Sequence, residues 1–104
     1  MNIVILGAGQ VGSELSAILA SDHDVTLIDL NQEKLQKISD HHDLKTICGN
    51  ACYPKTLEQA EIEKSDLAIA MTQYDEVNMV ACQMIKHISK RTKTMARIRA
   101  TQYL

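Results

Sequence analysis

Three glycines near the N-terminus have the spacing of a phosphate-binding loop. The segment Gly7-Ala8-Gly9-Gln10-Val11-Gly12 follows an aliphatic run, Asn2–Leu6, and opens a helical pattern. In a G-x-G-x-x-G segment the first glycine permits a tight turn, the second lets a diphosphate approach the backbone, and the third lets the helix pack against the strand. Unpaired N–H groups at the helix start would then bind the phosphates. The spacing therefore predicts a dinucleotide site with Gly7, Ala8, Gly9, Gln10, Val11 and Gly12 as cofactor-binding residues.

An acidic residue, Asp29, lies 22 residues beyond Gly7, at the end of the next apolar run. The separation is close to the roughly 20 residues expected for a carboxylate that binds ribose hydroxyls. A ribose 2′-phosphate about 4 Å from this charge would be repelled by roughly 4 kcal/mol at an effective dielectric constant near 20. No Lys or Arg follows immediately in Leu30-Asn31-Gln32, so the sequence favours NAD(H), or ATP or ADP, over NADP(H). The alternative is that the glycines only allow a turn and that Asp29 caps the following helix.

Apolar runs alternate with helical patterns along the chain, and this alternation predicts the fold. Strands are expected at Asn2–Leu6, Val25–Ile28, Leu44–Cys48, Leu67–Met71 and Thr94–Ile98, and helices at Gln10–Leu19, Asn31–Asp40 with Asn31 as N-cap, Pro54–Ala60 and Tyr74–Ser89. Such alternation requires right-handed crossovers and a parallel sheet. The expected fold class is α/β, a Rossmann-like doubly wound parallel sheet of at least five strands with helices on both faces. Residues 1–104 would form a single domain, and because a six-stranded sheet needs one more helix and strand, we expect a longer parent chain.

The other candidate residues follow the third and fourth expected strands. Ligands of doubly wound sheets bind beyond the carboxyl ends of the strands, which makes Asn50, Ala51, Thr72 and Gln73 candidates. Asn50 and Ala51 could contact the adenine edge. Thr72 has a second interpretation as N-cap of the following helix, with Asp75 three residues later, and the two roles are compatible.

The charge is divided unequally along the chain. The first 76 residues hold all thirteen acidic residues and five Lys or Arg, a net charge of −8, whereas the remainder holds six Lys or Arg and no acid, a net charge of +6. Lys86, Lys90 and Arg91 are expected near a helix C-terminus, where cations are favourable. Arg97 is expected to bind ligand phosphates, and Arg99 to do the same or to pair with a partner subunit. Since the basic segment contains a single tyrosine for stacking, no nucleic-acid partner is expected.

Composition and cysteine spacing argue against several classes of protein. No apolar run approaches the roughly 18–20 residues that span a bilayer, and the N-terminal segment is typical of a strand rather than of a signal peptide. Three cysteines, an odd number without a secretion signal, indicate a reduced, cytosolic chain. Cys48 and Cys82 are expected in the core and Cys52 at partial exposure. Their spacing matches no zinc motif, so a metal site built with His41 or His42 is not expected.

Several segments together resemble a known family. They are Asn2-Ile-Val-Ile-Leu-Gly-Ala-Gly-Gln-Val-Gly12, Asp29, Gly49-Asn-Ala51, Ala70-Met-Thr72, Asp75-Glu76-Val-Asn-Met-Val-Ala-Cys-Gln83 and Ala96-Arg-Ile-Arg99. Over essentially the whole chain they resemble the nucleotide-binding N-terminal domain of Trk-type potassium uptake regulators, the KTN/RCK or TrkA-N domain. The helix start and the Ala-Arg-Ile-Arg segment are more specific than the glycine fingerprint.

The resemblance implies a regulatory protein without catalysis. It would bind NAD(H), or in relatives ATP or ADP, through Gly7 to Val11, Asp29, Asn50, Ala51, Thr72, Gln73 and Arg97. It further implies a cytoplasmic protein, peripheral at the inner face of the cell membrane, that is homo-oligomeric. The partner would be a membrane potassium transporter subunit whose gating follows the ligand state. One departure is that relatives often carry an acid where this chain has Asn50.

Two other functions are weighed against this one. The cofactor-binding half of an NAD-dependent oxidoreductase would need a catalytic histidine or a Tyr-x-x-x-Lys pair. No lysine stands four residues after Tyr53 or Tyr74, and the four histidines fall away from the expected strand ends. A pure dimerisation module would use the stripe of Met84 and Ile88, although such helical stripes more often belong to a core.

Overall fold

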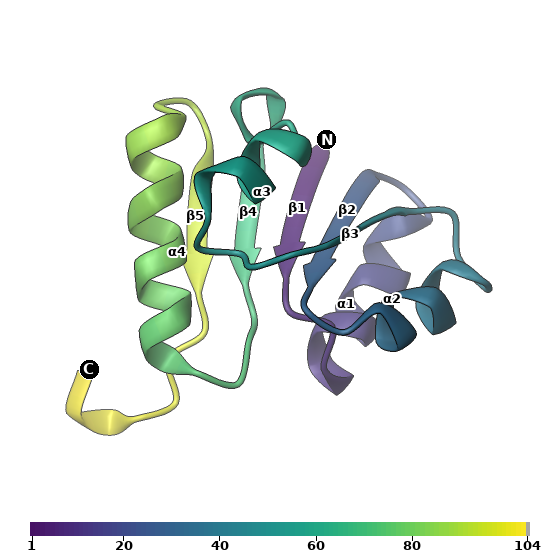
Figure 1. Ribbon diagram of the computed structural model, residues 1–104, viewed down its shortest axis with the longest axis horizontal. Coiled ribbons are helices and arrows are strands. Elements are labelled where there is room, and N and C mark those ends of the chain that lie inside the picture. The colour runs from purple at the N-terminus through teal and green to yellow at the C-terminus, as the bar shows by residue number, and fades with distance from the viewer. Residues whose placement is uncertain (104) are drawn as a thin grey trace.

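Five parallel strands form the centre of the computed structural model, which describes residues 1–103 (Figure 1). They are β1 (Asn2–Leu6), β2 (Asp24–Asp29), β3 (Lys45–Cys48), β4 (Leu67–Ala70) and β5 (Lys93–Ala96). Their order in the sheet is β3-β2-β1-β4-β5, and every neighbouring pair is parallel. The predicted Rossmann-like α/β fold is therefore confirmed.

Helices cover both faces of the sheet, as the alternating pattern predicted (Figure 1). They are α1 (Gln10–Ala20), α2 (Gln32–Ser39), α3 (Pro54–Gln59) and α4 (Asp75–Ile88). Strand β1 serves both layers because successive side chains point to opposite faces. Ile3 and Ile5 join the core that includes Leu35 of α2, whereas Val4 and Leu6 join the core beneath α3 and α4.

Local sequence accounts for where several helices begin and which face they bury. The Asn31 side chain accepts a hydrogen bond from Lys34 N at 3.1 Å and caps α2, as predicted. Pro54 occupies the first turn of α3, where its missing N–H costs nothing. Along α4, Met84 and Ile88 are partly buried and pack against the core, so this stripe is not a free dimerisation face.

Some local expectations were wrong, and long-range contacts explain why. Thr72 does not cap α4, since the helix begins only after Tyr74 and the Thr72 hydroxyl instead bonds to a side chain farther along the helix. Cys48 is exposed because it ends β3, the short edge strand. Two short 3₁₀ helices, η1 (Ile62–Lys64) and η2 (Thr101–Tyr103), had no recognised sequence pattern.

The carboxyl ends of all five strands lie along one edge of the sheet, the lower edge in Figure 1. From β1 the chain builds β2 and β3 on one side, and it then crosses over to build β4 and β5 on the other. The order reverses between β1 and β4, which is where such folds bind ligands. In residues 1–103 no helix is long and apolar enough to cross a membrane.

Candidate nucleotide-binding site

The glycine-rich loop leaves β1 through a turn that other residues would not tolerate. Gly7 has a φ of 110°, a conformation that L side chains rarely adopt, and its N–H donates to Ile28 O at 2.7 Å. A Cβ on Gly7 would lie 2.9 Å from Thr72 N, so the loop also packs directly against the segment after β4. A Cβ on Gly12 would overlap the Gly7 carbonyl oxygen, which explains the close packing of α1 on β1.

The start of α1 has no side-chain cap. Its first helical hydrogen bond runs from Ser13 N to Gly9 O at 2.8 Å, so the N–H groups of Gln10, Val11 and Gly12 precede the intrahelical pattern. No side chain caps α1 and no acid lies in its first turn, whereas α2 has the Asn31 cap and α4 has two acids. A Cβ added to Gly9 would meet no atom within 4 Å, so the backbone is accessible there.

Asp29 ends β2 and reaches the glycine-rich loop. Its Oδ1 accepts a hydrogen bond from Ala8 N at 2.8 Å and its Oδ2 accepts one from Asn31 N at 2.8 Å. The Asp29 carbonyl accepts from Gly49 N at 2.9 Å, which ties β3's exit to the same point. A carboxylate has about four acceptor positions, so two remain for ribose hydroxyls. Asp29 thus holds the glycine-rich loop and the start of the segment that leads to α2.

The segment after β3 lies beside Asp29, because β3 is the neighbour of β2 in the sheet. Asn50 uses its Oδ1 to accept from Cys52 N at 2.8 Å, forming a tight turn. The Ala51 side chain is buried in the core beneath α3 and α4. Of these two predicted adenine contacts, Ala51 could therefore reach a ligand only through its backbone.

The segments after β4 and β5 close the other side of the switch point. Arg97 N donates to Ala70 O at 2.9 Å, which continues the pairing of these strands past their ends. The Arg97 side chain is half-buried, and the ion pairs of residues 1–103, Lys64–Glu61 and Arg91–Asp66, do not involve it. Gln73 is exposed, with its carbonyl accepting from Arg99 Nη2 at 2.7 Å. Thr72 is half-buried against the Gly7 turn.

All the residues predicted from the sequence thus lie along one edge. Contacts run from Gly49 through Asp29 to Ala8 and on from Gly7 to Thr72. Arg97 joins this row through its backbone bond to β4.

One residue at this edge was missed. Asn78 is fully buried in α4 and joins the backbones of Thr72 and Arg97 through hydrogen bonds of 2.9–3.1 Å, with a further bond of 2.7 Å from the Thr72 hydroxyl. Its spacing could have identified it, since Asn78, Ala81, Cys82 and Ile85 follow the i, i+3, i+4, i+7 rule for one helix face. An amide on a buried face needs partners.

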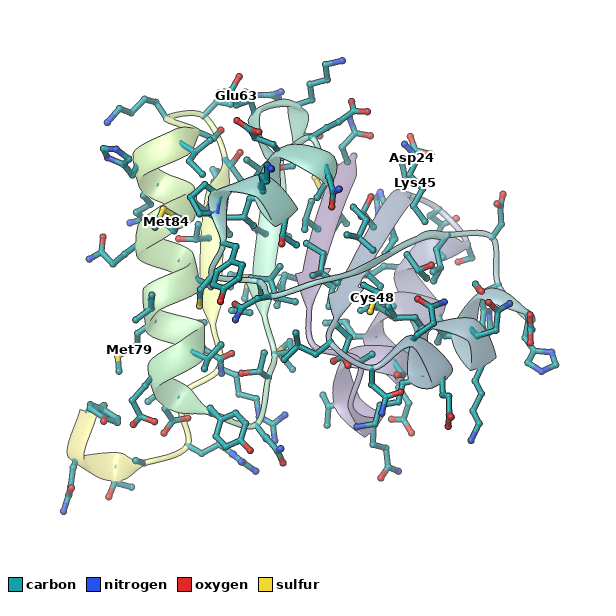
Figure 2. The ribbon with its side chains drawn as sticks, viewed as in Figure 1. Asp24, Lys45, Cys48, Glu63, Met79 and Met84 are labelled. Carbon is teal, nitrogen blue, oxygen red and sulfur yellow. The ribbon has the colours of Figure 1, made fainter. Side chains whose placement is uncertain are left out.

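Positive charge beside the glycine-rich loop was also missed. A hollow of about 340 Å³ opens between α1 and α2, and its lining residues are Ala8, Gly9, Gln10, Ser13, Lys34, Lys37, Ile38, His41 and His42. Lys34 and Lys37 stand five and eight residues beyond Asp29, after the three residues that directly follow it. A larger hollow of about 440 Å³ lies at the opposite edge, where Asp24 and Lys45 are labelled in Figure 2, and it contains none of the predicted site residues.

The segment after β5 is fastened to the start of α4. The Asp75 carboxylate accepts from Arg99 N at 3.0 Å and Ala100 N at 2.9 Å, and Tyr103 donates to Glu76 Oε2 at 2.6 Å. One guanidinium nitrogen of Arg99 is thus bonded to the chain's own loop, at the Gln73 carbonyl. The two acids have a structural role here besides complementing the helix dipole.

This attachment should depend on pH. The two backbone hydrogen bonds hold the pKa of Asp75 below its ordinary value. A depressed folded-state pKa means that the stabilisation is present above the unfolded-state value, about 3.9, and is lost as pH falls through the folded value. We therefore expect the amide NMR signals of Arg99 and Ala100 to titrate together with a midpoint below about 3.9. Asp75→Asn should abolish this transition, and its persistence in that variant would contradict the assignment.

No three His, Cys, Asp or Glu side chains gather as a metal site within residues 1–103. Burial raises the pKa of the Cys52 and Cys82 thiols, which disfavours the thiolate that a metal would bind.

Comparison with known proteins identifies the family. The model of the TrkA-N domain matches residues 3–104. The chain belongs to the TrkA-N domain family. This TrkA-N domain is 45% identical over 105 residues to the Trk system potassium uptake protein TrkA of Haemophilus influenzae and 43% identical over 105 residues to that of Halomonas elongata. Each alignment covers 100% of this chain and 23% of the relative, so the chain spans about a quarter of their length.

Solved structures give the same fold. The TrkA-N domain of inner membrane protein ybaL from Escherichia coli superposes with a TM-score of 0.88 at 19% identity, over 97% of this chain and 75% of that one. Shewanella denitrificans Kef CTD in its AMP-bound form has a TM-score of 0.83 at 16% identity, over 99% of this chain and 62% of that one. At these identities the likeness shows the fold of the TrkA-N domain alone.

Proposed function

We propose that this chain is a nucleotide-sensing module that binds NAD(H) without catalysing a reaction. The observation that carries the proposal is the uncapped start of α1, which lies at the switch point beside a carboxylate already oriented toward the loop. An unneutralised helix N-terminus favours a phosphate, and a carboxylate one strand away favours ribose hydroxyls. The two requirements of a dinucleotide are thus met by adjacent groups.

A binding pose follows from these positions. The diphosphate would contact the N–H groups from Gly9 to Gly12, with the adenosine ribose at Asp29 and the adenine near the Asn50 turn. Arg97 would provide a charge-assisted contact to the phosphates from the β5 side. Thr72 and Gln73 would border the ligand after β4. The AMP-bound form of Kef CTD supports an adenine nucleotide as ligand, because that protein has the same fold.

We infer a preference for NAD(H) over NADP(H), with ATP or ADP as further ligands. A 2′-phosphate would lie beside the Asp29 charge and be repelled. Lys34 and Lys37, which line the adjacent hollow, oppose this effect, but both are exposed and therefore screened by solvent and salt. Asp29 is half-buried and its position is held by two hydrogen bonds, so its effect should dominate.

The wider biological role rests on the relatives. Proteins similar to this chain are named for the Trk potassium uptake system. We propose that the chain acts as part of a cytoplasmic regulatory subunit of such a system, homo-oligomeric and peripheral at the inner face of the membrane. Its partner would be a membrane potassium transporter subunit.

Ligand binding would act through the β4–α4 region. A nucleotide that bridges the glycine-rich loop and the segments after β4 and β5 could change the position of α4 or of a partner packed on it. Moving an equilibrium from about 1% to about 99% active requires roughly 10⁴-fold preferential binding to one state, about 5.5 kcal/mol. Any smaller preference would give a graded response.

The direct test is a thermal-shift panel of NADH, NAD, ATP, ADP and NADPH. A ligand that binds the folded state raises the melting temperature by an amount that grows with its concentration relative to its dissociation constant. We expect NADH to stabilise the chain more than NADPH does. Failure of all five ligands to raise the melting temperature would overturn the proposed function.

Arg97→Ala should weaken NADH binding by roughly tenfold or more, because hydrogen bonds to charged groups contribute about 1.5–3 kcal/mol. Isothermal titration calorimetry at two salt concentrations measures this, and the loss should be smaller at high salt, where screening already weakens the contact. Arg91→Ala is the matched control, since Arg91 pairs with Asp66 at the opposite edge of the sheet at 2.6 Å. Equal losses in both variants would remove Arg97 from the site.

The oxidoreductase alternative has only the fold in its favour. Structures of dehydrogenases superpose with TM-scores of 0.69–0.70 at 13–24% identity. The Tyr-x-x-x-Lys pair of such enzymes is not found at Tyr53 or Tyr74, since neither is followed by a lysine four residues later. Hydride transfer from bound NADH to an added ketone or aldehyde would contradict the non-catalytic proposal.

A further inference from the structure

Asn78 is an unusual side chain to find inside α4. It is fully buried, and it shares its helix face with Ala81, Cys82 and Ile85. The other buried polar side chains of residues 1–103 are all hydroxyls, from Ser16, Thr56, Ser65, Ser89 and Thr92. An amide is costly to bury unless its hydrogen bonds are made, so the partners of Asn78 indicate what it is for.

Every hydrogen-bonding position of the amide is used, and every partner lies at the candidate site. Oδ1 accepts from Thr72 N at 2.9 Å and from the Thr72 hydroxyl at 2.7 Å. Nδ2 donates to Thr72 O at 3.1 Å and to Arg97 O at 2.9 Å. The orientation of the amide is determined by these partners, because a backbone N–H can only donate and a carbonyl can only accept.

These bonds join the segment that follows β4 to the segment that follows β5. Thr72 follows β4 and Arg97 follows β5, and the strands pair directly up to Ala70 and Ala96. Beyond that point a single backbone bond, Arg97 N to Ala70 O, continues the pairing. The Asn78 amide lies between the two segments where they leave the sheet, and it bonds to both of them.

The Thr72 backbone is also in contact with the glycine-rich loop. A Cβ on Gly7 would lie only 2.9 Å from Thr72 N, so a displacement of Thr72 would reach the turn that begins the phosphate-binding segment. Asn78 therefore contacts both halves of the site. It bonds directly to the Arg97 backbone after β5, and it reaches the glycine-rich loop after β1 through Thr72.

We propose that Asn78 is a positioning residue of the nucleotide site, which holds Thr72 and Arg97 in the arrangement that the ligand requires. This inference rests on the proposed function. Asn78 itself would not touch the ligand, since it is buried beneath these segments. Its effect would be pre-organisation, because a site whose groups are already in place loses less conformational freedom on binding.

The test compares Asn78→Ala, Arg97→Ala and the double variant for NADH affinity by calorimetry, at a temperature where circular dichroism shows each to be folded. We expect Asn78→Ala to weaken binding roughly tenfold. If Asn78 acts through Arg97, most of that loss should disappear in the Arg97→Ala background, because coupled residues are non-additive. Hydrogen exchange at Thr72 N–H, measured without ligand, should also be faster in Asn78→Ala.

Two further variants separate positioning from stability. Ser89→Ala removes a buried hydroxyl just past the far end of α4, bonded to Thr92 at 2.6 Å, and it should lower the melting temperature while leaving NADH affinity within about twofold. Asn78→Asp keeps the shape but cannot donate to both carbonyls, and it provides the same test if Asn78→Ala does not fold.

The outcomes are distinguishable. The inference would be overturned if wild type binds NADH and both Asn78→Ala and Asn78→Asp bind it equally well. It would also be overturned if the loss in Asn78→Ala adds fully to the loss in Arg97→Ala. Neither result would contradict the proposed function. A wild-type chain that binds none of the nucleotides would overturn both.

Discussion

Gly12→Ala should lower the free energy of unfolding by about 3 kcal/mol or more, at the upper end of what overpacking costs. The added methyl group would overlap the Gly7 carbonyl oxygen, and the atom it meets is backbone, which cannot rotate away. Relief would require α1 to move off β1, and this is the contact that forms the glycine-rich loop. Chemical denaturation followed by circular dichroism measures the change.

Gly9→Ala is the matched control, because it makes the same chemical change three residues earlier in the same motif. No atom lies within 4 Å of the new methyl, and the φ of −70° is accessible to alanine. Gly9 is the N-cap of α1, where alanine is less favourable than glycine. The free energy of unfolding should therefore fall, but by no more than about 1 kcal/mol. Its nucleotide affinity should nevertheless fall, since the methyl occupies the space through which a diphosphate would approach.

The pair of variants thus separates packing from binding. Equal stability of Gly12→Ala and wild type would show that α1 does not pack on Gly7 as described. Full NADH affinity in Gly9→Ala would show that the phosphates lie elsewhere.

Replacing Asp29 should have the largest effect on ligand choice. We expect Asp29→Ala to weaken NADH binding by roughly a hundredfold, because a ribose contact to a charged acceptor is lost and the Ala8 and Asn31 N–H groups lose their partner. Asp29→Asn should bind NADH more tightly than Asp29→Ala does. In both variants the preference for NADH over NADPH should narrow, since the charge that repels a 2′-phosphate is gone.

Calorimetry with NADH and NADPH on the three proteins gives these affinities. Lys34→Ala is the informative companion, because Lys34 lines the hollow beside the loop without contacting Asp29 through a hydrogen bond. It should lower NADPH affinity more than NADH affinity. Equal NADH affinity in Asp29→Ala and wild type would remove Asp29 from the pocket.

The division of charge along the chain has a structural explanation in part. Arg91 pairs with Asp66, and Arg99 bonds to the loop after β4, so these cations fasten the basic end of the chain to its acidic part. Asp75 accepts from the same basic end. Two arginines, Arg97 and Arg99, follow β5. Within residues 1–103, the Arg97 side chain makes no ion pair and no hydrogen bond to the loop after β4, whereas Arg99 bonds to that loop.

Much of the architecture could be predicted from local patterns. Buried aliphatic runs, helical spacing, the Asn31 cap and Pro54 are short-range features, and each acts on the few residues around it. Parallel strands with right-handed crossovers then leave few topologies. For the same reason Gly7, Asp29, Thr72 and Arg97 could be placed at one edge of the sheet, because each lies at or just after the carboxyl end of a strand.

Other roles depend on residues far apart in the chain. Thr72 was expected to cap α4, but its hydroxyl donates a hydrogen bond to the Asn78 side chain instead. Cys48 was expected in the core, but it is exposed because its strand lies at the edge of the sheet. Lys34 and Lys37 approach the glycine-rich loop only because α2 packs beside α1. Gly9 and Gly12 are the same residue type in one motif, yet one faces open space and the other faces a backbone oxygen. Spacing along a chain specifies which edge a residue reaches, whereas its neighbours there are determined by how separate segments pack.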